Sequence, residues 1–170
     1  MKRNKRIFSK YKNLEYIIGD GESLPFRDYT FDKCVSTFVL EHFLNDIRAL
    51  KEMNRILKPG GILILTADSL SYPKADKDFI KKINDNVNNY TKQNLEEKLK
   101  KSGFEIVECR YFVNSPISYF FFRLTTINNV FLVLTTFAYP LCFLSDRLFG
   151  VSEGGMYIAC KAKKIRHMRA

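Results

Sequence analysis

The sequence predicts an α/β protein with a doubly wound, mostly parallel sheet, because strand-like apolar runs alternate with segments of helical periodicity. The run ILILT at residues 62–66 is almost wholly apolar, as is typical of a parallel strand covered on both faces. Residues 31–38 are rich in Val, Thr and Phe, which indicates a second strand. Further strands are expected at residues 14–18, 104–112 and 155–162.

Two helices have recognisable boundaries. The first begins at about Asn45 and carries apolar residues at helical spacing until Pro59-Gly60-Gly61, where proline cannot continue a helix. The second begins after Thr91, a residue type that caps helix N-termini, and ends at Gly103. Each helix connects two expected strands, which supports the α/β prediction.

One domain with two basic ends is expected from the composition. The 170 residues suffice for a single core, and the formal net charge is +10. Six Lys or Arg lie in residues 1–12 and five in residues 161–170, with no acid in either segment, so the remainder is near neutral. Such ends suit an anionic membrane surface, although solvated tails are the simpler interpretation. No specific nucleic-acid partner is expected.

Four cysteines are spread along the chain, and none forms a C-x-x-C pair. All four lie among apolar residues, so we expect buried free thiols in a reducing, cytoplasmic compartment. Neither a disulfide framework nor a metal site is expected. The cysteines are Cys34, Cys109, Cys142 and Cys160.

Residues 115–150 form an unusually apolar segment between the last two expected strands. The run VFLVLTTFAYPLCFL at 130–144 is interrupted by Pro140 and is shorter than the roughly 20 residues that a membrane-spanning helix needs. We expect one or two apolar helices here, with a turn at Asn128-Asn129. A lid over an apolar substrate, a contact with a membrane surface and ordinary core packing remain open.

Three motifs follow one another between residues 19 and 61. They are GDGESLPF at 19–26, FDKCV at 31–35 followed by LEH at 40–42, and EMNRILKPGG at 52–61. Their order and spacing resemble the type 11 family of class I S-adenosylmethionine-dependent methyltransferases, which is similar to the ubiquinone/menaquinone methyltransferases. The resemblance implies that this chain is a single partial methyltransferase domain over residues 1–170.

The resemblance also implies a cofactor site for S-adenosyl-L-methionine. In the family, an acid after the third strand accepts hydrogen bonds from the adenine, and the end of the fourth strand lines the central pocket. Ligands of open α/β sheets bind at the carboxyl ends of strands, so this placement is chemically sensible. The cofactor-binding residues implied here are Asp20, Gly21, Glu22, Ser36, Thr37 and Phe38.

His42 is the candidate catalytic residue, because an imidazole could act as a general base. A role at a helix start or in packing is favoured, since methyl transfer to an activated nucleophile needs no base. Glu52 and Arg55 are three residues apart on a helix and are expected to form no more than an exposed ion pair.

The family's sheet order is 3-2-1-4-5-7-6, and its glycine-rich loop would lie upstream of these motifs. Without strands one and two, the strand expected at 14–18 must pair with 31–38, or the chain is incomplete as a functional unit. Three functions are therefore open. They are methyl transfer to an apolar or lipid-like small molecule, a truncated remnant that needs an upstream segment or partner, and a peripheral membrane-binding module.

Overall fold

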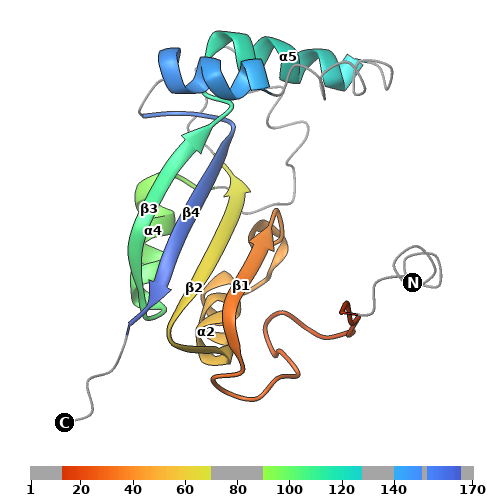
Figure 1. Cartoon of the computed structure of the whole chain (residues 1–170), viewed down its shortest axis with the longest axis vertical. Coiled ribbons are helices and arrows are strands. Elements are labelled where there is room, and N and C mark those ends of the chain that lie inside the picture. The colour runs from red at the N-terminus through yellow and green to blue at the C-terminus, as the bar shows by residue number, and fades with distance from the viewer. Residues whose placement is uncertain (1–12, 70–89, 128–139, 151–152, 166–170) are drawn as a thin grey trace.

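The structure is a computed structural model, and it describes residues 13–69, 90–127, 140–150 and 153–165. The described residues form one four-stranded sheet with the order β1-β2-β4-β3 (Figure 1). This order corresponds to the last four positions, 4-5-7-6, of the order that the resemblance implies, and the predicted α/β class is confirmed. The strands are β1 (Phe31–Thr37), β2 (Leu57–Asp68), β3 (Phe104–Phe112) and β4 (Tyr157–Lys164).

Three of the four strands point in the same direction, as expected for a mostly parallel sheet, and only β4 of the described strands runs against them. Strands β1 and β2 are parallel, with Val35 opposite Ile64 and Thr37 opposite Thr66. Strand β4 runs antiparallel to both β2 and β3, because it returns between them from the far end of the sheet. The carboxyl ends of β1, β2 and β3 therefore meet at the same edge as the beginning of β4.

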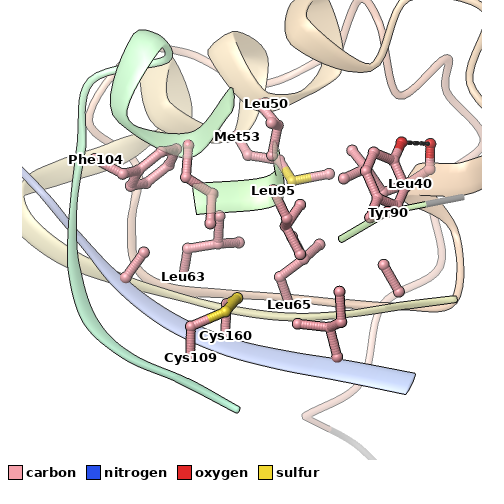
Figure 2. Packing of buried hydrophobic residues seen from close by; sticks show 14 of the residues in the cluster. Leu40, Leu50, Met53, Leu63, Leu65, Tyr90, Leu95, Phe104, Cys109 and Cys160 are labelled. Carbon is pink, nitrogen blue, oxygen red and sulfur yellow. Dashed lines mark hydrogen bonds between the residues drawn. A yellow bond between two sulfur atoms is a disulfide. The ribbon is translucent and has the colours of Figure 1, made fainter. Parts of the chain in front are cut away.

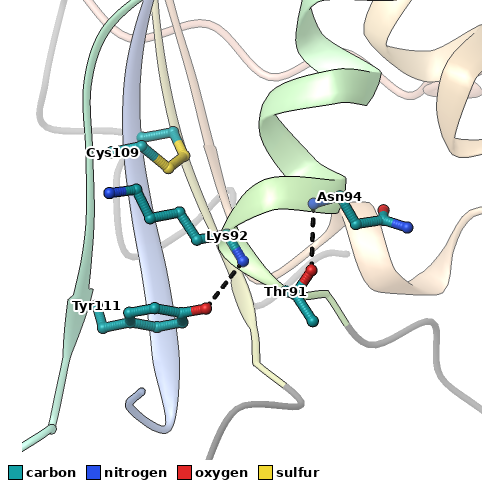
Figure 3. Close-up of a disulfide and its surroundings, with 6 residues drawn as sticks. Thr91, Lys92, Asn94, Cys109 and Tyr111 are labelled. Carbon is teal, nitrogen blue, oxygen red and sulfur yellow. Dashed lines mark hydrogen bonds between the residues drawn. A yellow bond between two sulfur atoms is a disulfide. The ribbon is translucent and has the colours of Figure 1, made fainter. Parts of the chain in front are cut away.

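Two helices, α2 (Asp46–Ile56) and α4 (Lys92–Lys101), lie on the same face of the sheet (Figure 1). Asn45 caps α2 by accepting a hydrogen bond from the Arg48 amide at 3.0 Å. Thr91 caps α4 by accepting one from the Asn94 amide at 3.1 Å (Figure 3). Both helix starts predicted from the sequence are confirmed, and both depend on side chains that satisfy otherwise unpaired amides.

The end of α2 was predicted too late in the sequence. The helix ends at Ile56, and Leu57 already has extended backbone angles and begins β2. Pro59 and Gly60 lie inside β2, opposite a register shift between Phe31 and Lys33, and Gly60 has a φ of 80°. The proline and glycine therefore shape an irregular start of the strand rather than the end of the helix.

The hydrophobic core lies between the sheet and these two helices. Leu63 and Leu65 of β2 point toward α2 and α4, where they meet Leu50 and Leu95 (Figure 2). All four side chains are completely buried. The alternate residues of the sheet face the other way, and there Ile64 is 42% exposed and Val35 64% exposed. Within the described residues, the sheet is thus covered on one face only.

Residues 14–18 do not form the predicted strand. They have no regular secondary structure, and Ile17 and Ile18 are 58% and 72% exposed. Among the described residues β1 pairs with β2 alone, so this segment does not move across to the outer edge of β1. An apolar run becomes a strand only where a neighbouring strand completes its hydrogen bonds, and the described residues offer it none.

The prediction of four free thiols was wrong for Cys109 and Cys160, which form a disulfide (Figure 3). These residues stand directly opposite each other on β3 and β4. Their proximity results from strand register, although 51 residues separate them in the sequence. Cys34 and Cys142 are free, and burial raises the pKa of both thiols.

Part of the basic C-terminal segment belongs to the fold. Lys161, Lys163 and Lys164 lie in β4 rather than in a solvated tail. The Lys164 ammonium is buried and donates to the carbonyls of Asn54 at 2.6 Å and Leu57 at 2.8 Å. These carbonyls lie at the C-terminal end of α2, where a cation offsets the helix dipole. Desolvation lowers the pKa of Lys164.

Two apolar helical segments stand at one end of the molecule, beyond β3 and β4. They are α5 (Pro116–Ile127) and residues 140–149, which lie beside each other (Figure 1). Asp146 joins them by accepting hydrogen bonds from the amides of Val113, Asn114 and Ser115. The predicted turn at Asn128-Asn129 lies outside the described residues. No helix in the described ranges is long and apolar enough to cross a bilayer.

Neighbouring residues of β2 allow the one-sided core to be tested. We expect Leu65→Ala to lower the free energy of unfolding by about 2–5 kcal/mol, since it empties a fully buried site. Ile64→Ala, on the exposed face, should cost less than about 1 kcal/mol. Urea unfolding followed by circular dichroism measures both. Equal losses would mean that both faces are covered in solution.

Candidate functional site

The segment 20–23 forms a tight turn before β1. The Ser23 amide donates to the Asp20 carbonyl at 3.0 Å, and the Glu22 amide donates to the Asp20 carboxylate at 2.9 Å. The side chain of Asp20 is exposed, and its carboxylate is oriented by its own turn. Asp20 therefore presents an anionic acceptor toward solvent at a fixed position.

This turn is attached to the residues that follow the carboxyl end of β1. Gly21 lies against the ring of Phe43, and a side chain at this position would collide with that ring. The Glu22 carboxylate accepts the Asn45 amide at 3.0 Å, and the Glu22 carbonyl accepts Arg48 Nε at 2.9 Å. The structure thus brings Asp20, Gly21 and Glu22 to the start of α2. For Glu22, its hydrogen bond to Asn45 provides a structural role that the sequence did not indicate.

Arg55 holds the next part of the same loop. Its guanidinium donates to the carbonyls of Leu24 at 3.0 Å and Phe26 at 2.8 Å. It also pairs with Asp28 at 2.7 Å and with Glu52 at 2.8 Å, and Glu52 in turn accepts the Leu24 amide at 2.9 Å. Arg55 lowers the pKa of Glu52. The expectation of no more than an exposed ion pair was wrong, because the planar guanidinium reaches backbone carbonyls as well as carboxylates.

The three residues predicted at the end of β1 do not share one surface. Ser36 stands opposite Leu65 and is buried on the helix-covered face, where it packs in the core. Thr37 is exposed on the other face. Phe38 has a φ of 51°, a conformation unusual for a residue with a side chain, and its amide donates to the Thr66 carbonyl at 3.1 Å. Their assignment to the cofactor stays a prediction.

His42 ends a short 3-10 helix, η1 (Leu40–His42), which follows β1. Its side chain is exposed, whereas its neighbour Glu41 is almost completely buried. Desolvation raises the pKa of Glu41 and of Asp68 at the end of β2, and His42 opposes both shifts. The structure therefore places His42 beside two carboxylates, and its catalytic role stays a prediction.

Aromatic rings gather next to these carboxylates. Tyr157 lies 4.9 Å from Phe38 and 5.2 Å from Phe112, measured between ring centroids. Phe122 of α5 lies 5.9 Å from Tyr157. This aromatic group joins β3, β4, α5 and the residue that follows β1 at one end of the sheet. The sequence did not single it out, since its members come from four separate parts of the chain.

The described residues fit one end of the implied cofactor. An exposed carboxylate on a fixed turn, at the carboxyl edge of a parallel pair, suits the amino group of an adenine. Within residues 13–69, no glycine-rich loop joins a strand to a helix, so the described chain offers no counterpart for the ribose and methionine ends. No three His, Cys, Asp or Glu among the described residues gather as metal ligands.

Comparisons with known proteins agree with this arrangement. A family model described as a methyltransferase domain of type 11 matches residues 1–65. An uncharacterised protein of Methanocaldococcus jannaschii is 29% identical over 145 residues, which cover 69% of this chain and 58% of that protein. The ubiquinone/menaquinone biosynthesis C-methyltransferase of Coxiella burnetii is 38% identical over 55 residues, 32% of this chain and 22% of that enzyme.

Solved structures share the fold at low sequence identity. A possible histamine N-methyltransferase from Thermotoga maritima gives a TM-score of 0.62 at 22% identity and covers 96% of this chain and 70% of that one. The phosphoethanolamine N-methyltransferase 2 of Haemonchus contortus gives 0.65 at 18% identity, covering 95% and 40%. The [4+2]-cyclase SpnF gives 0.65 at 22% identity, covering 97% and 61%. The fold alone therefore does not determine the reaction.

The sheet order, the helices on it and the turn at the carboxyl edge define the fold of the class I methyltransferases. Within that class, residues 1–65 match the type 11 family of S-adenosylmethionine-dependent methyltransferases, and the relatives and solved structures described above agree with this match. The cofactor of this family is S-adenosyl-L-methionine. The chain spans 58% of the Methanocaldococcus jannaschii protein and about a fifth of the Coxiella burnetii enzyme.

The Arg55 contacts generate a prediction about the loop. Arg55→Lys keeps the charge but cannot donate to Leu24, Phe26, Asp28 and Glu52 together, so we expect a loss of about 1.5–3 kcal/mol in unfolding free energy. Hydrogen exchange of the Leu24 amide should become faster. The control is Lys58→Ala, which removes an exposed pair with Asp32 and should cost less than about 1 kcal/mol. Unchanged exchange at Leu24 would contradict the role of Arg55.

Proposed function

We propose that this chain takes part in S-adenosylmethionine-dependent methyl transfer to a small-molecule acceptor that is apolar or lipid-like. The family supports the reaction type, and the name of the Coxiella burnetii relative associates that enzyme with quinone biosynthesis. The apolar helices α5 and 140–149, which stand beyond the carboxyl edge of the sheet, support an apolar acceptor.

The observation that carries the proposal is the attachment of the Asp20 turn to the start of α2. Gly21 against Phe43 and Glu22 bonded to Asn45 hold the Asp20 carboxylate near the end of β1. In this proposal Asp20 accepts hydrogen bonds from the adenine amino group, and Gly21 lets the ring approach the backbone. The cofactor, once bound, supplies an electrophilic methyl group on a sulfonium. The protein then acts chiefly by holding the acceptor in line with that methyl group.

A titration with S-adenosylmethionine tests whether the chain contacts only the adenine end of the cofactor. We expect the 170-residue chain to bind more weakly than low-micromolar, because its described residues contact only the adenine end. Asp20→Ala should weaken the remaining binding by about 1–3 kcal/mol, the scale of a lost hydrogen bond to a charged group. Ligand-observed NMR can measure such weak affinities.

Asp32→Ala is the matched control, because Asp32 lies at the opposite end of β1 and pairs with Lys58. It should leave cofactor binding unchanged. Low-micromolar affinity of the wild-type chain, or equal effects of the two substitutions, would contradict the proposal. If binding needs an upstream segment or a partner, Asp20→Ala should still weaken cofactor binding, and Asp32→Ala should still leave it unchanged, once that segment or partner is supplied.

A second candidate function is supported by the exposed side chains of the helical end. Seven large apolar residues there are between 46% and 67% exposed, and such patches mark contacts with a lipid, a ligand or a partner. In this candidate the end rests on an anionic membrane surface from the cytoplasmic side, helped by the basic residues of the segment 1–12. Lys164 does not contribute, because it is buried against the end of α2. The seven apolar residues are Ile117, Phe120, Leu141, Phe143, Leu144, Leu148 and Phe149.

Co-sedimentation with liposomes tests the membrane contact. We expect binding that rises with anionic lipid content and falls at least tenfold in Leu144→Asp/Leu148→Asp, since these residues are one helical turn apart and both exposed. Val107→Asp on β3 is the control, because Val107 is exposed away from the helical end. Liposome binding that depends neither on the anionic lipid content nor on the double substitution would contradict a membrane contact.

A further inference from the structure

Glu41 is a buried carboxylate whose surroundings leave it incompletely satisfied. The residue is 2% exposed, and its Oε2 atom has no hydrogen-bond partner in the described chain. The hydroxyl of Thr66 is buried and unpartnered in the same way. An unpaired buried carboxylate is costly, so its presence calls for an explanation beyond packing.

A second carboxylate stands beside Glu41. The Phe38 amide donates to the Thr66 carbonyl at 3.1 Å, which ties the chain just before Glu41 to the end of β2. Asp68 follows Thr66 by two residues and faces the same side of the strand. The pKa of both carboxyl groups is raised by desolvation, and Asp68 raises that of Glu41 further. The two carboxylates therefore share one corner at the carboxyl edge of the sheet.

The aromatic group adjoins this corner. Asp68 stands opposite Tyr157, and Tyr157 stands opposite Phe112, so the three side chains follow one another across one face of the sheet. Phe38 and Phe122 complete the group and lead to the exposed apolar side chains of α5. The carboxylates of Glu41 and Asp68 therefore lie next to the aromatic group, and the aromatic group lies next to the apolar side chains of α5.

We propose that Glu41 and Asp68, with the rings of Phe38, Phe112 and Tyr157, bind the cationic nitrogen of an amine whose remainder is apolar, and that this amine is the methyl acceptor. This rests on the proposed function. An ammonium donates to the unpartnered carboxylate oxygen and neutralises the charge of the corner. Aromatic faces attract ammonium groups, including methylated ones, and the surface toward α5 takes the hydrocarbon part.

The chemistry of transfer is balanced at this site. The bound ammonium gives one proton to a carboxylate of the corner, and the lone pair of its nitrogen forms a bond to the sulfonium methyl carbon. The carbon–sulfur bond breaks, and its electron pair stays on sulfur. The product is a methylated ammonium, which the same carboxylates and rings can hold.

Other charged groups nearby do not replace the amine. His42 is exposed at the end of η1. Lys98 is paired with Asp46 at 2.7 Å, and Asp46 also accepts the Tyr90 hydroxyl at 2.9 Å. Lys98 therefore has another carboxylate as its partner. His42 lies beside Glu41 and Asp68 but donates no hydrogen bond to Glu41 Oε2, which keeps its unused acceptor position.

Calorimetric titration of the whole chain with octylamine and octanol, without cofactor, tests the amine site. We expect octylamine to bind at least tenfold more tightly than octanol. Glu41→Gln and Asp68→Asn should each weaken octylamine binding at least fivefold and leave octanol unchanged. Glu97→Gln is the control, because Glu97 is an exposed carboxylate on α4, and it should change neither affinity.

Thermal unfolding separates a binding role from a structural one. Near neutral pH, Glu41→Gln should melt at or above the wild-type temperature. The raised pKa of Glu41 means that its ionised form opposes folding, and the amide removes that charge. Equal affinities for octylamine and octanol, no effect of either carboxylate change, or a lower melting temperature for Glu41→Gln would each overturn the proposal. Asp68→Asn keeps the test usable if Glu41→Gln does not fold.

The outcome is distinguishable from that of the proposed function. Octylamine binding does not require the cofactor. Selective octylamine binding without methyl transfer would therefore support the amine site and contradict the proposed reaction. Methyl transfer to an acceptor that lacks nitrogen would retain the reaction and overturn the amine site.

Discussion

The position of the Asp20 turn depends on α2. At the start of the helix, the Asn45 amide donates a hydrogen bond to the Glu22 carboxylate. Near its end, Arg55 donates to the loop carbonyls of Leu24 and Phe26. Lys164 of β4 completes the anchoring by donating to the last carbonyls of the helix. Because hydrogen bonds to a guanidinium or ammonium are among the stronger ones in proteins, α2 can hold this loop without help from a strand.

This arrangement explains how the chain combines a firm core with a sheet that, among the described residues, is covered on one face only. Leu63 and Leu65 pack against α2 and α4, so the helix-covered face contributes most of the burial. The same helix then carries the residues that the family motifs share. The core and the Asp20 turn, the adenine contact in the proposed function, are consequently linked through α2, whereas the helical end is joined to the sheet through Asp146 and Tyr157.

Local signals predicted much of this fold. Thr91 and Gly103 mark α4 correctly, because capping and positive φ are properties of single residues. Strand β3 was predicted with its observed bounds. The failures have a common physical origin in long-range contacts. Residues 14–18 lack a partner strand, and the Cys109–Cys160 bond depends on register across 51 residues.

The cofactor site stays a prediction from the motifs. The structure shows that the turn with Asp20 and Gly21 lies against residues that follow the carboxyl end of β1. The LEH motif drew attention to His42, although its buried neighbour Glu41 has the more unusual environment. Asp68 carries no local signal, because its importance comes from standing near Glu41 and opposite Tyr157. Arg55 was undervalued for the same reason, since its loop partners are distant in sequence.

The outer edge of β1 has a consequence for handling the protein at high concentration. Among the described residues β1 pairs with β2 alone, so no described strand pairs with its other side. From Cys34 to Thr37 the strand carries no charged side chain that would repel a second strand. Natural sheets protect such edges with charges, prolines or covering segments. Here Asp32 and Lys33 provide charge only at the beginning of the strand. Crowded copies of the chain should therefore self-associate through this edge, and precipitation would reflect pairing between folded molecules rather than unfolding.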